Sequence, residues 1–261
     1  MLLLQDLVQR IIQRPDEIAL RREYASLVEP ANPAYAAFIR DQIWLAQRGR
    51  QPGNADWLQR SRSTAEAELR HGREWAPPVL RSKRRYPRIA YRSGFVETIE
   101  TAASRLLADA GELFRSAPIR YLILTGAKKH LPVLAGLPAM RSILALDLTR
   151  CDLEDSDLEL LCSSPNLAGL RWLSLAGNRI TRHGAEALAV ATKSGGLRHL
   201  GYVDWGGNPF NPCDRPVWDQ DLVVDLEQPP GGRELEAAYG HLPWLHRQVT
   251  EDGLLDYASP L

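Results

Sequence analysis

Long hydrophobic stretches are missing from this chain of 261 residues. Because no run of about 18 apolar residues occurs, we expect no membrane-spanning helix. The apolar start Met-Leu-Leu-Leu is interrupted by Asp6, too early for the hydrophobic core of a signal peptide. These absences predict a cytoplasmic protein without a membrane partner.

Cysteine is scarce as well. The three cysteines, Cys151, Cys162 and Cys213, are an odd number and show no CxxC spacing. This pattern argues against a disulfide framework and against a zinc site. We expect Cys151 and Cys162 to be small buried hydrophobic residues.

Catalytic motifs are also absent. The chain has no GxSxG, no HExxH, no glycine-rich phosphate loop followed by lysine, and no GxGxxG after a strand. His183 and His199 fit ordinary surface histidines, and the acidic residues around Asp155 fit the positive end of a helix dipole. We therefore expect a protein that is not an enzyme and that uses no metal and no cofactor.

Net charge is zero, but the two halves of the chain differ. Residues 1–94 carry 17 basic and 10 acidic residues, whereas residues 95–261 carry 15 basic and 22 acidic residues. The halves therefore have net charges of +7 and −7. Such asymmetry indicates either two surfaces with different partners or attraction between opposite halves of two copies.

What the chain does contain is a repeated leucine pattern. Leu170, Leu173, Leu175 and Asn178 fill the fixed positions of L-x-x-L-x-L-x-x-N, the strand motif typical of leucine-rich repeats. The frame recurs in Ile119, Leu122 and Leu124; in Ile143, Leu146, Leu148 and Cys151; and in Leu197, Leu200 and Tyr202. The first residues of successive copies are 24, 27 and 27 positions apart, within the roughly 20–29 residues expected.

Helical periodicity precedes the repeats. Four helices are predicted within about ninety residues, at 2–14, 18–27, 34–47 and 56–74. Residues 211–261 suit a terminal unit that covers the open end of a solenoid core, and Trp205 suits a core residue of that cap. The domains are therefore a helical cap at 1–92, repeats at 93–210 and a C-terminal cap or tail at 211–261. The predicted fold class is α/β, a short leucine-rich-repeat solenoid with parallel strands on its concave face, preceded by an all-α cap.

The helical region resembles the repeat-companion domain, a short module found in front of leucine-rich repeats in bacterial proteins. The resemblance covers roughly residues 3–96 and rests on Pro15-Asp16, Leu20-Arg21, Tyr24-Ala25, Phe38-Ile39-Arg40, Gln42 and His71-Gly72-Arg73-Glu74-Trp75. This chain departs from the family at 26–29 and at 31–33. After Asn178, the spacing from Ile180 to Ala189 resembles the longer repeat of ribonuclease-inhibitor-like proteins. The resemblance implies a fold and a bacterial context, but no activity.

Outward-facing positions of the repeats are the candidate partner-binding site. The third, fifth and seventh positions of the motif point to the concave face, and the candidate residues are Tyr121, Ile123, Asp147, Trp172, Ser174 and His199. We expect Trp172, flanked by Tyr121 and His199, to be the anchor, because aromatic residues dominate interface hot spots. The alternative is that Trp172 lies under the N-terminal cap or the C-terminal tail of the same chain.

The leading hypothesis is a non-enzymatic protein–protein interaction module, a recognition or scaffold subunit of a bacterial complex, whose partner is another protein. One alternative is a nucleic-acid-associated protein that uses the basic stretch 81–92, where Tyr86 and Tyr91 are interleaved with arginines. That stretch also suits a solvated linker, and a neutral protein lacks the usual basic footprint. A further alternative is a substrate or accessory factor of a bacterial defence or signalling effector such as a protease.

Overall fold

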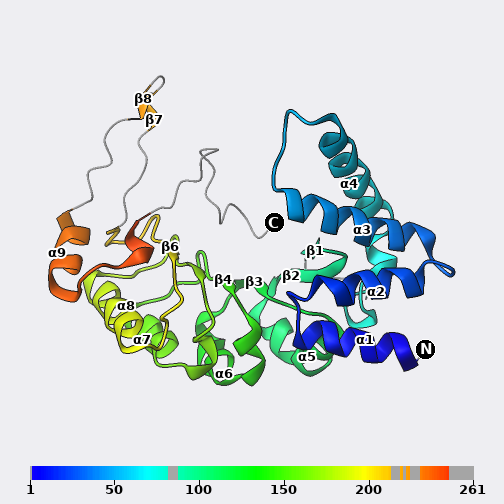
Figure 1. Ribbon diagram of the computed structural model, residues 1–261. Coiled ribbons are helices and arrows are strands. Elements are labelled where there is room, and N and C mark those ends of the chain that lie inside the picture. Colours follow the sequence, from blue (N-terminus) through cyan, green and yellow to red (C-terminus); the bar gives the residue numbers. More distant parts are fainter. Residues whose placement is uncertain (1, 82–87, 213–217, 220–221, 224–229, 247–261) are drawn as a thin grey trace. The chain divides into compact units, whose positions relative to one another are not determined.

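The computed structural model describes residues 2–81, 88–212, 218–219, 222–223 and 230–246 (Figure 1). The chain forms two compact units, one made of residues 1–100 and 108–120 and the other of residues 101–107 and 121–261. Helices and mainly parallel strands make up an α/β fold, as predicted. None of the helices in these described ranges has the length and apolarity needed to cross a bilayer.

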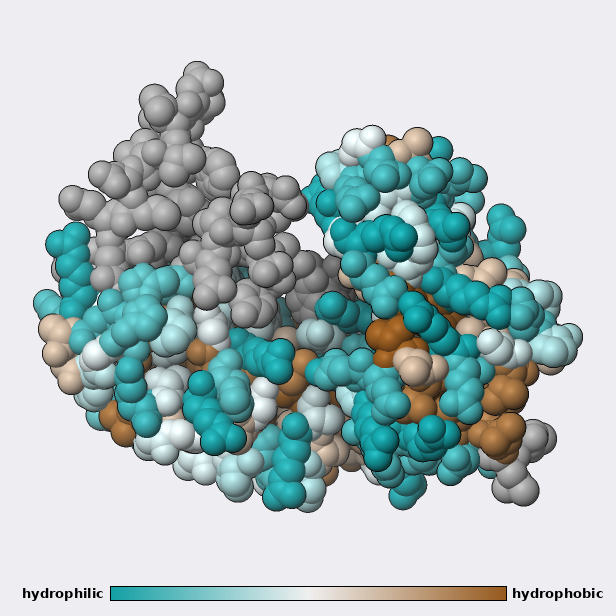
Figure 2. Space-filling model, in the orientation of Figure 1, coloured by the Kyte–Doolittle hydropathy of each residue, from teal (hydrophilic) through white to brown (hydrophobic). Residues whose placement is uncertain are grey.

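Four helices begin the first unit at the predicted positions: α1 (Leu2–Gln13), α2 (Ile18–Val28), α3 (Pro33–Arg48) and α4 (Ala55–Trp75). Asparagine caps define two of the starts, because Asn32 Oδ1 accepts from Tyr35 N and Asn54 Oδ1 accepts from Trp57 N. Each helix packs against the next one in the chain. Figure 2 shows hydrophobic side chains around the start of α1, where Leu3 is 58% exposed.

A β-hairpin completes the first unit and corrects the prediction of an all-α cap. Strands β1 (Arg88–Arg92) and β2 (Phe95–Ala102) pair antiparallel around the two-residue turn Ser93-Gly94, where both residues have positive φ. This turn type suits the twist of a hairpin. Close packing also requires glycine at position 94, because a Cβ there would lie 2.4 Å from Ile39 Cγ1. Strand β1 was missed because residues 76–92, which include it, have the proline-rich, basic composition of a linker.

A buried ion pair joins α2 to this hairpin. The Arg21 side chain is 1% exposed and donates from Nη2 to Glu97 Oε1 at 2.5 Å. It also donates to the carbonyl oxygens of Pro15 and Arg92, each at 2.7 Å. Burial raises the pKa of Glu97, and the nearby Arg21 opposes that shift. Arg21 therefore links three separate segments of the first unit.

Four parallel strands form the sheet of the second unit in chain order: β3 (Tyr121–Thr125), β4 (Ala145–Asp147), β5 (Trp172–Ser174) and β6 (Tyr202–Asp204). Helices α6 (Leu131–Gly136), α7 (Asp155–Cys162) and α8 (Arg182–Ser194) lie on one side of these strands (Figure 1). Helix α9 (Pro230–Tyr239) packs against α8. Helix α5 (Ala103–Ser116) contributes residues to both units. The remaining elements are β7 (Trp218–Asp219), β8 (Leu222–Val223) and the short 3-10 helices η1 (Pro78–Leu80), η2 (Lys128–His130), η3 (Pro138–Ser142), η4 (Pro165–Leu167) and η5 (Pro243–Leu245).

The leucine frame is correct for the first three strands of this sheet and wrong for the fourth. Register pairs Leu173 with Val203 and Trp172 with Tyr202. The strand spans 202–204, so the predicted frame of Leu197, Leu200 and Tyr202 is wrong. Its buried frame is Leu200, Val203 and Trp205, followed by Asn208.

Backbone conformation supports the corrected frame independently. Gly126, Arg150, Gly177 and Gly207 all have positive φ, between 54° and 75°. Each lies seven residues after a buried aliphatic residue, namely Ile119, Ile143, Leu170 and Leu200 in turn. The same left-handed turn thus follows each strand. Glycine suits that conformation best, and Arg150 is the exception.

Side chains one position after these turns link successive strand segments. Asn178 Nδ2 donates to Leu148 O at 3.0 Å, and Asn208 Nδ2 donates to Leu175 O at 2.8 Å. Cys151 makes the corresponding contact, from Sγ to Leu124 O at 3.2 Å. A thiol is a weak donor, which explains physically why cysteine serves at the asparagine position.

Candidate interaction surface on the sheet

The side of the β3–β6 sheet away from α6–α8 is the candidate functional surface. Alternate residues of a strand point to opposite sides, and the residues between the ones named next are buried leucines and Val203. We call this surface the strand face and define it as Tyr121, Ile123, Ala145, Asp147, Trp172, Ser174, Tyr202 and Asp204. It contains five of the six predicted site residues; His199 is the exception.

An aromatic row crosses the strand face. Register aligns Tyr121, Ala145, Trp172 and Tyr202 on neighbouring strands. The rings of Trp172 and Tyr202 are stacked, with centroids 5.7 Å apart and an interplanar angle of 9°. Trp172 is half-buried and Tyr202 is buried. Trp172 has two neighbours in this row. Ala145 on one side has only a methyl group, whereas Tyr202 on the other side has a ring.

A second row lies next to the aromatic one and is polar at three of its four positions. It consists of Ile123, Asp147, Ser174 and Asp204, and we call it the acidic row because of its two aspartates. Asp147 Oδ1 accepts from Thr149 N at 2.8 Å, and Asp204 Oδ1 accepts from Gly206 N at 2.9 Å. These bonds hold the turns that follow the strands. The two aspartates therefore have a structural role in addition to making the row acidic.

His199 does not belong to this surface. It is exposed, precedes β6, and its Nε2 accepts a hydrogen bond from Arg198 Nε at 3.1 Å. The residue beside Trp172 is Tyr202, which the predicted leucine frame of Leu197, Leu200 and Tyr202 placed on the opposite side of the strand. Asp204 was not predicted as a site residue. The signal that identifies both is Asn208, whose side chain makes the same backbone contact as Asn178.

Trp205 lies on the opposite side of the sheet, in the core. It is buried, and its ring centroid lies 5.7 Å from that of Trp244 in η5. The prediction that Trp205 is a core residue is therefore confirmed. The predicted C-terminal cap at 211–261 is described only in part, and its segment 247–261 lies outside the described residues.

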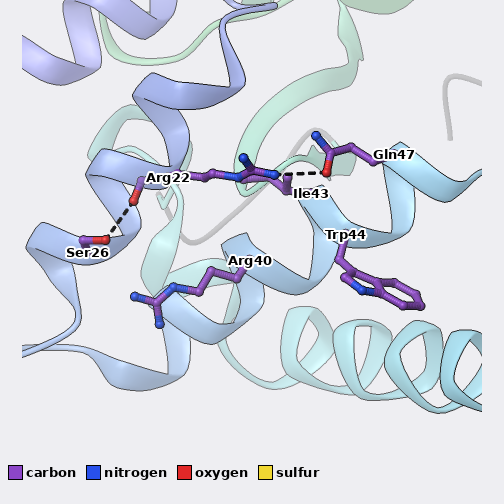
Figure 3. A pocket seen from close by; sticks show the side chains of 6 residues that line it. All are labelled: Arg22, Ser26, Arg40, Ile43, Trp44 and Gln47. Carbon is purple, nitrogen blue, oxygen red and sulfur yellow. Dashed lines mark hydrogen bonds between the residues drawn. The ribbon is translucent and has the colours of Figure 1, made fainter.

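A second candidate is a cavity of about 330 Å³ in the first unit, between α2 and α3 (Figure 3). Its lining residues are Arg22, Ser26, Arg40, Ile43, Trp44 and Gln47. Arg22 extends over Ile43 toward Gln47 and donates to its Oε1 at 3.0 Å. The Trp44 ring projects away from this pair.

The charged groups of this cavity are already engaged. Arg40 donates from Nη1 and Nη2 to the two carboxylate oxygens of Glu29, at 2.5 and 2.6 Å. An incoming anion would have to compete with Glu29 for both nitrogens, and such bidentate pairs are the stronger ones. The strand face is therefore the better candidate.

The basic stretch 81–92 is described only at its ends. Arg81 Nε donates to Ala76 O at 2.6 Å, and Arg88 Nη1 lies 3.8 Å from Glu100 Oε2. The centre of the stretch, residues 82–87, lies outside the described residues. Arg81 and Arg88 thus both contact groups of the chain itself.

The candidate nucleophiles Ser174, Cys151 and Cys162 are not activated. Ser174 Oγ lies 2.8 Å from the hydroxyl of Thr149, which is neither a base nor an acid at neutral pH. Burial raises the pKa of Cys162 to about 12, and it also raises the pKa of Cys151. A thiol with a raised pKa is a poor nucleophile. None of these three groups therefore has the surroundings of an activated nucleophile.

Comparison with known proteins finds no matching family model, no similar curated protein and no similar solved structure.

Proposed function

We propose that this chain is a non-enzymatic protein-interaction module whose strand face binds another protein. The observation that carries the proposal is the stacked pair Trp172–Tyr202, which lies beside an acidic row. Aromatic side chains supply large, rigid contact areas and dominate interface hot spots. Asp147 and Asp204 favour a partner surface with basic residues.

We further propose that the second unit is a leucine-rich-repeat solenoid. Three observations support this proposal: the recurring buried leucine frame, the left-handed turn after each strand, and the side-chain contacts of Asn178 and Asn208. In such repeats the strands present an extended binding surface. The strand face would be the concave surface of that solenoid.

The biological setting of the proposal comes from sequence resemblance. A helical unit that resembles a repeat-companion module precedes the strands, and the later repeat resembles those of ribonuclease-inhibitor-like proteins. We propose on this basis a recognition or scaffold subunit of a bacterial complex in the cytoplasm.

The test is affinity purification of the tagged protein from its native cell after nuclease treatment, followed by mass spectrometry. Wild type is compared with Trp172→Ala and with Val133→Ala, which removes a 59% exposed side chain from α6 on the other side of the sheet. A stoichiometric protein lost with Trp172→Ala and kept with Val133→Ala supports the proposal. Equal recovery by all three proteins contradicts it.

The same experiment separates the alternatives. Partners that disappear on nuclease treatment would indicate that nucleic acid mediates the association. The basic stretch 81–92 would then be the candidate binding segment. In that case affinity should fall steeply with salt and with Arg84→Ala and Arg85→Ala, because phosphate contacts release counterions. Recovery of the chain cut at one site would indicate a substrate of a protease.

A further inference from the structure

Three side chains with metal-binding atoms converge at the C-terminal end of α9. Glu236 Oε1 lies 3.1 Å from His241 Nδ1 and 2.9 Å from His246 Nε2. The three ligand atoms all lie within 4.8 Å of one another. The two imidazole rings face each other, with centroids 5.1 Å apart and an interplanar angle of 23°.

Backbone structure positions the three groups. Glu236 is in the last turn of α9, and Gly240, with φ of 73°, ends the helix by donating from N to Glu236 O at 2.8 Å. His241 follows at once, and His246 comes directly after η5. The segment between the histidines is anchored by three buried side chains, Leu242, Trp244 and Leu245. The histidines thus belong to a segment attached to the core at both the helix end and η5.

Hydrogen bonding alone leaves this arrangement crowded. Leu242 N also donates to Glu236 Oε1, at 2.8 Å, so this single oxygen faces three nitrogen atoms. A carboxylate oxygen has about two lone-pair sites. Both histidines would also have to carry a proton on the nitrogen that faces Glu236. A cation between the three groups would relieve the crowding at Glu236 Oε1. It would also remove the need for a proton on each facing histidine nitrogen, since neutral imidazoles direct lone pairs toward a cation.

We propose that Glu236, His241 and His246 form a binding site for a divalent transition-metal ion, with zinc as the physiological candidate. Two imidazole nitrogens and one carboxylate oxygen are a common ligand set for zinc. With metal–ligand distances of about 2.0–2.2 Å, ligand atoms of a tetrahedral site lie about 3.4 Å apart. The two separations from Glu236, of 2.9 and 3.1 Å, need to widen slightly to reach that geometry, and the two histidine nitrogens lie within 4.8 Å of each other.

The site is at the surface, so three protein ligands leave the fourth position to water. His241 has a 71% exposed side chain, whereas Glu236 is 21% exposed. One positive group is close, because Lys193 Nζ donates to His241 O at 2.6 Å. It contacts the backbone carbonyl rather than the ring. A bound ion would join the end of α9 to η5, whose Trp244 packs against Trp205.

The test uses the full chain with a tag that contains no histidines. The protein is stripped with EDTA, freed of chelator and titrated with zinc by calorimetry and by competition with a chromophoric chelator. We expect one ion per chain. Loss of an outer-shell partner of a metal site already lowers affinity roughly 10–100-fold, so His241→Ala and His246→Ala should each lower it at least tenfold.

The matched control is His183→Ala. His183 Nε2 lies 3.0 Å from Glu159 Oε1, so it is also an exposed histidine beside one carboxylate, but no third group completes a cluster among the described residues. Its removal should leave zinc affinity unchanged. If an alanine variant fails to fold, Glu236→Gln serves instead, because its amide oxygen still accepts from Leu242 N while it binds zinc weakly. Absence of saturable zinc binding, or equal affinity in wild type and in the cluster variants, would overturn the site.

Discussion

Trp172 and Tyr202 lie on neighbouring parallel strands and stack with an interplanar angle of 9°. They are 30 positions apart in the chain, three more than the 27 that separate the predicted copies. The longer segment places Tyr202 beside Trp172 and leaves His199 in the preceding loop. The aromatic row of the strand face therefore contains a stacked pair of rings, and this pairing depends on the length of the segment between Trp172 and Tyr202.

Asp147→Asn should weaken partner binding without unfolding the chain. The asparagine keeps the oxygen that accepts from Thr149 N, so the turn is retained while the charge is lost. If a basic partner surface faces the acidic row, the loss of charge should slow association more at low than at high salt. Binding kinetics at two salt concentrations check this. Identical salt dependence in wild type and variant would contradict the role of Asp147.

Asn178→Ala should destabilise the chain by about 2–4 kcal/mol, since unsatisfied buried polar groups cost about 1–3 kcal/mol each. Asn178 is 5% exposed, and its Oδ1 accepts from Cys151 N and Leu153 N, both at 3.0 Å. Asn208→Ala is the comparison, because Asn208 makes similar contacts in a half-buried position. Urea unfolding measures both. A larger loss for Asn208→Ala would contradict the assigned contacts.

Arg21→Met should cost about 3–5 kcal/mol at pH 7, because it leaves the Glu97 charge buried without its main partner. The pKa of Glu97 is already raised by burial, and loss of Arg21 raises it further. Above the ordinary carboxyl pKa the folded state then binds more protons than the unfolded state, so stability falls as pH rises through that window.

The destabilisation by Arg21→Met should therefore be smaller at pH 5 than at pH 7. Urea unfolding of wild type and variant at both pH values gives the comparison. The double variant Arg21→Met, Glu97→Leu removes both charges and should recover part of the loss. A destabilisation that grows toward pH 5 would contradict an ionised Glu97 as its cause.

Cys162 should react slowly with iodoacetamide in the folded protein at pH 8. Burial raises its pKa to about 12, so only about one thiol in ten thousand is ionised at that pH, and the thiolate is the reactive form. Peptide mass spectrometry after timed labelling checks this prediction, with urea-unfolded protein as the control. Complete labelling of folded protein at the rate of the unfolded control would contradict it.

Local signals sufficed for most helices and for three strands. Asn32 and Asn54 precede α3 and α4 as capping residues, and each marks its boundary without reference to distant parts of the chain. The fourth strand was misplaced because two leucine frames overlap there. Leu197, Leu200 and Tyr202 match the motif with regular spacing, whereas Val203 and Trp205 match it only when Asn208 is included.

Other features depend on contacts that the pattern does not reveal. Strand β1 lies in a proline-rich, basic stretch, and the positive φ of the turn Ser93-Gly94, which pairs β1 with β2, is seen only in the structure. The cluster of Glu236, His241 and His246 requires a helix end and a 3-10 turn to bring its members together. Neither follows from periodicity, since each depends on where the backbone reverses.

The most direct test of the strand face measures the binding of a purified partner to wild type, Trp172→Ala and Val133→Ala. The partner is the protein recovered by affinity purification, and circular dichroism establishes that all three chains are folded. We expect Trp172→Ala to weaken binding by at least about 2 kcal/mol, the threshold of a hot spot, and Val133→Ala to bind as wild type does. Equal affinity of Trp172→Ala and wild type would contradict the proposal that the strand face binds the partner.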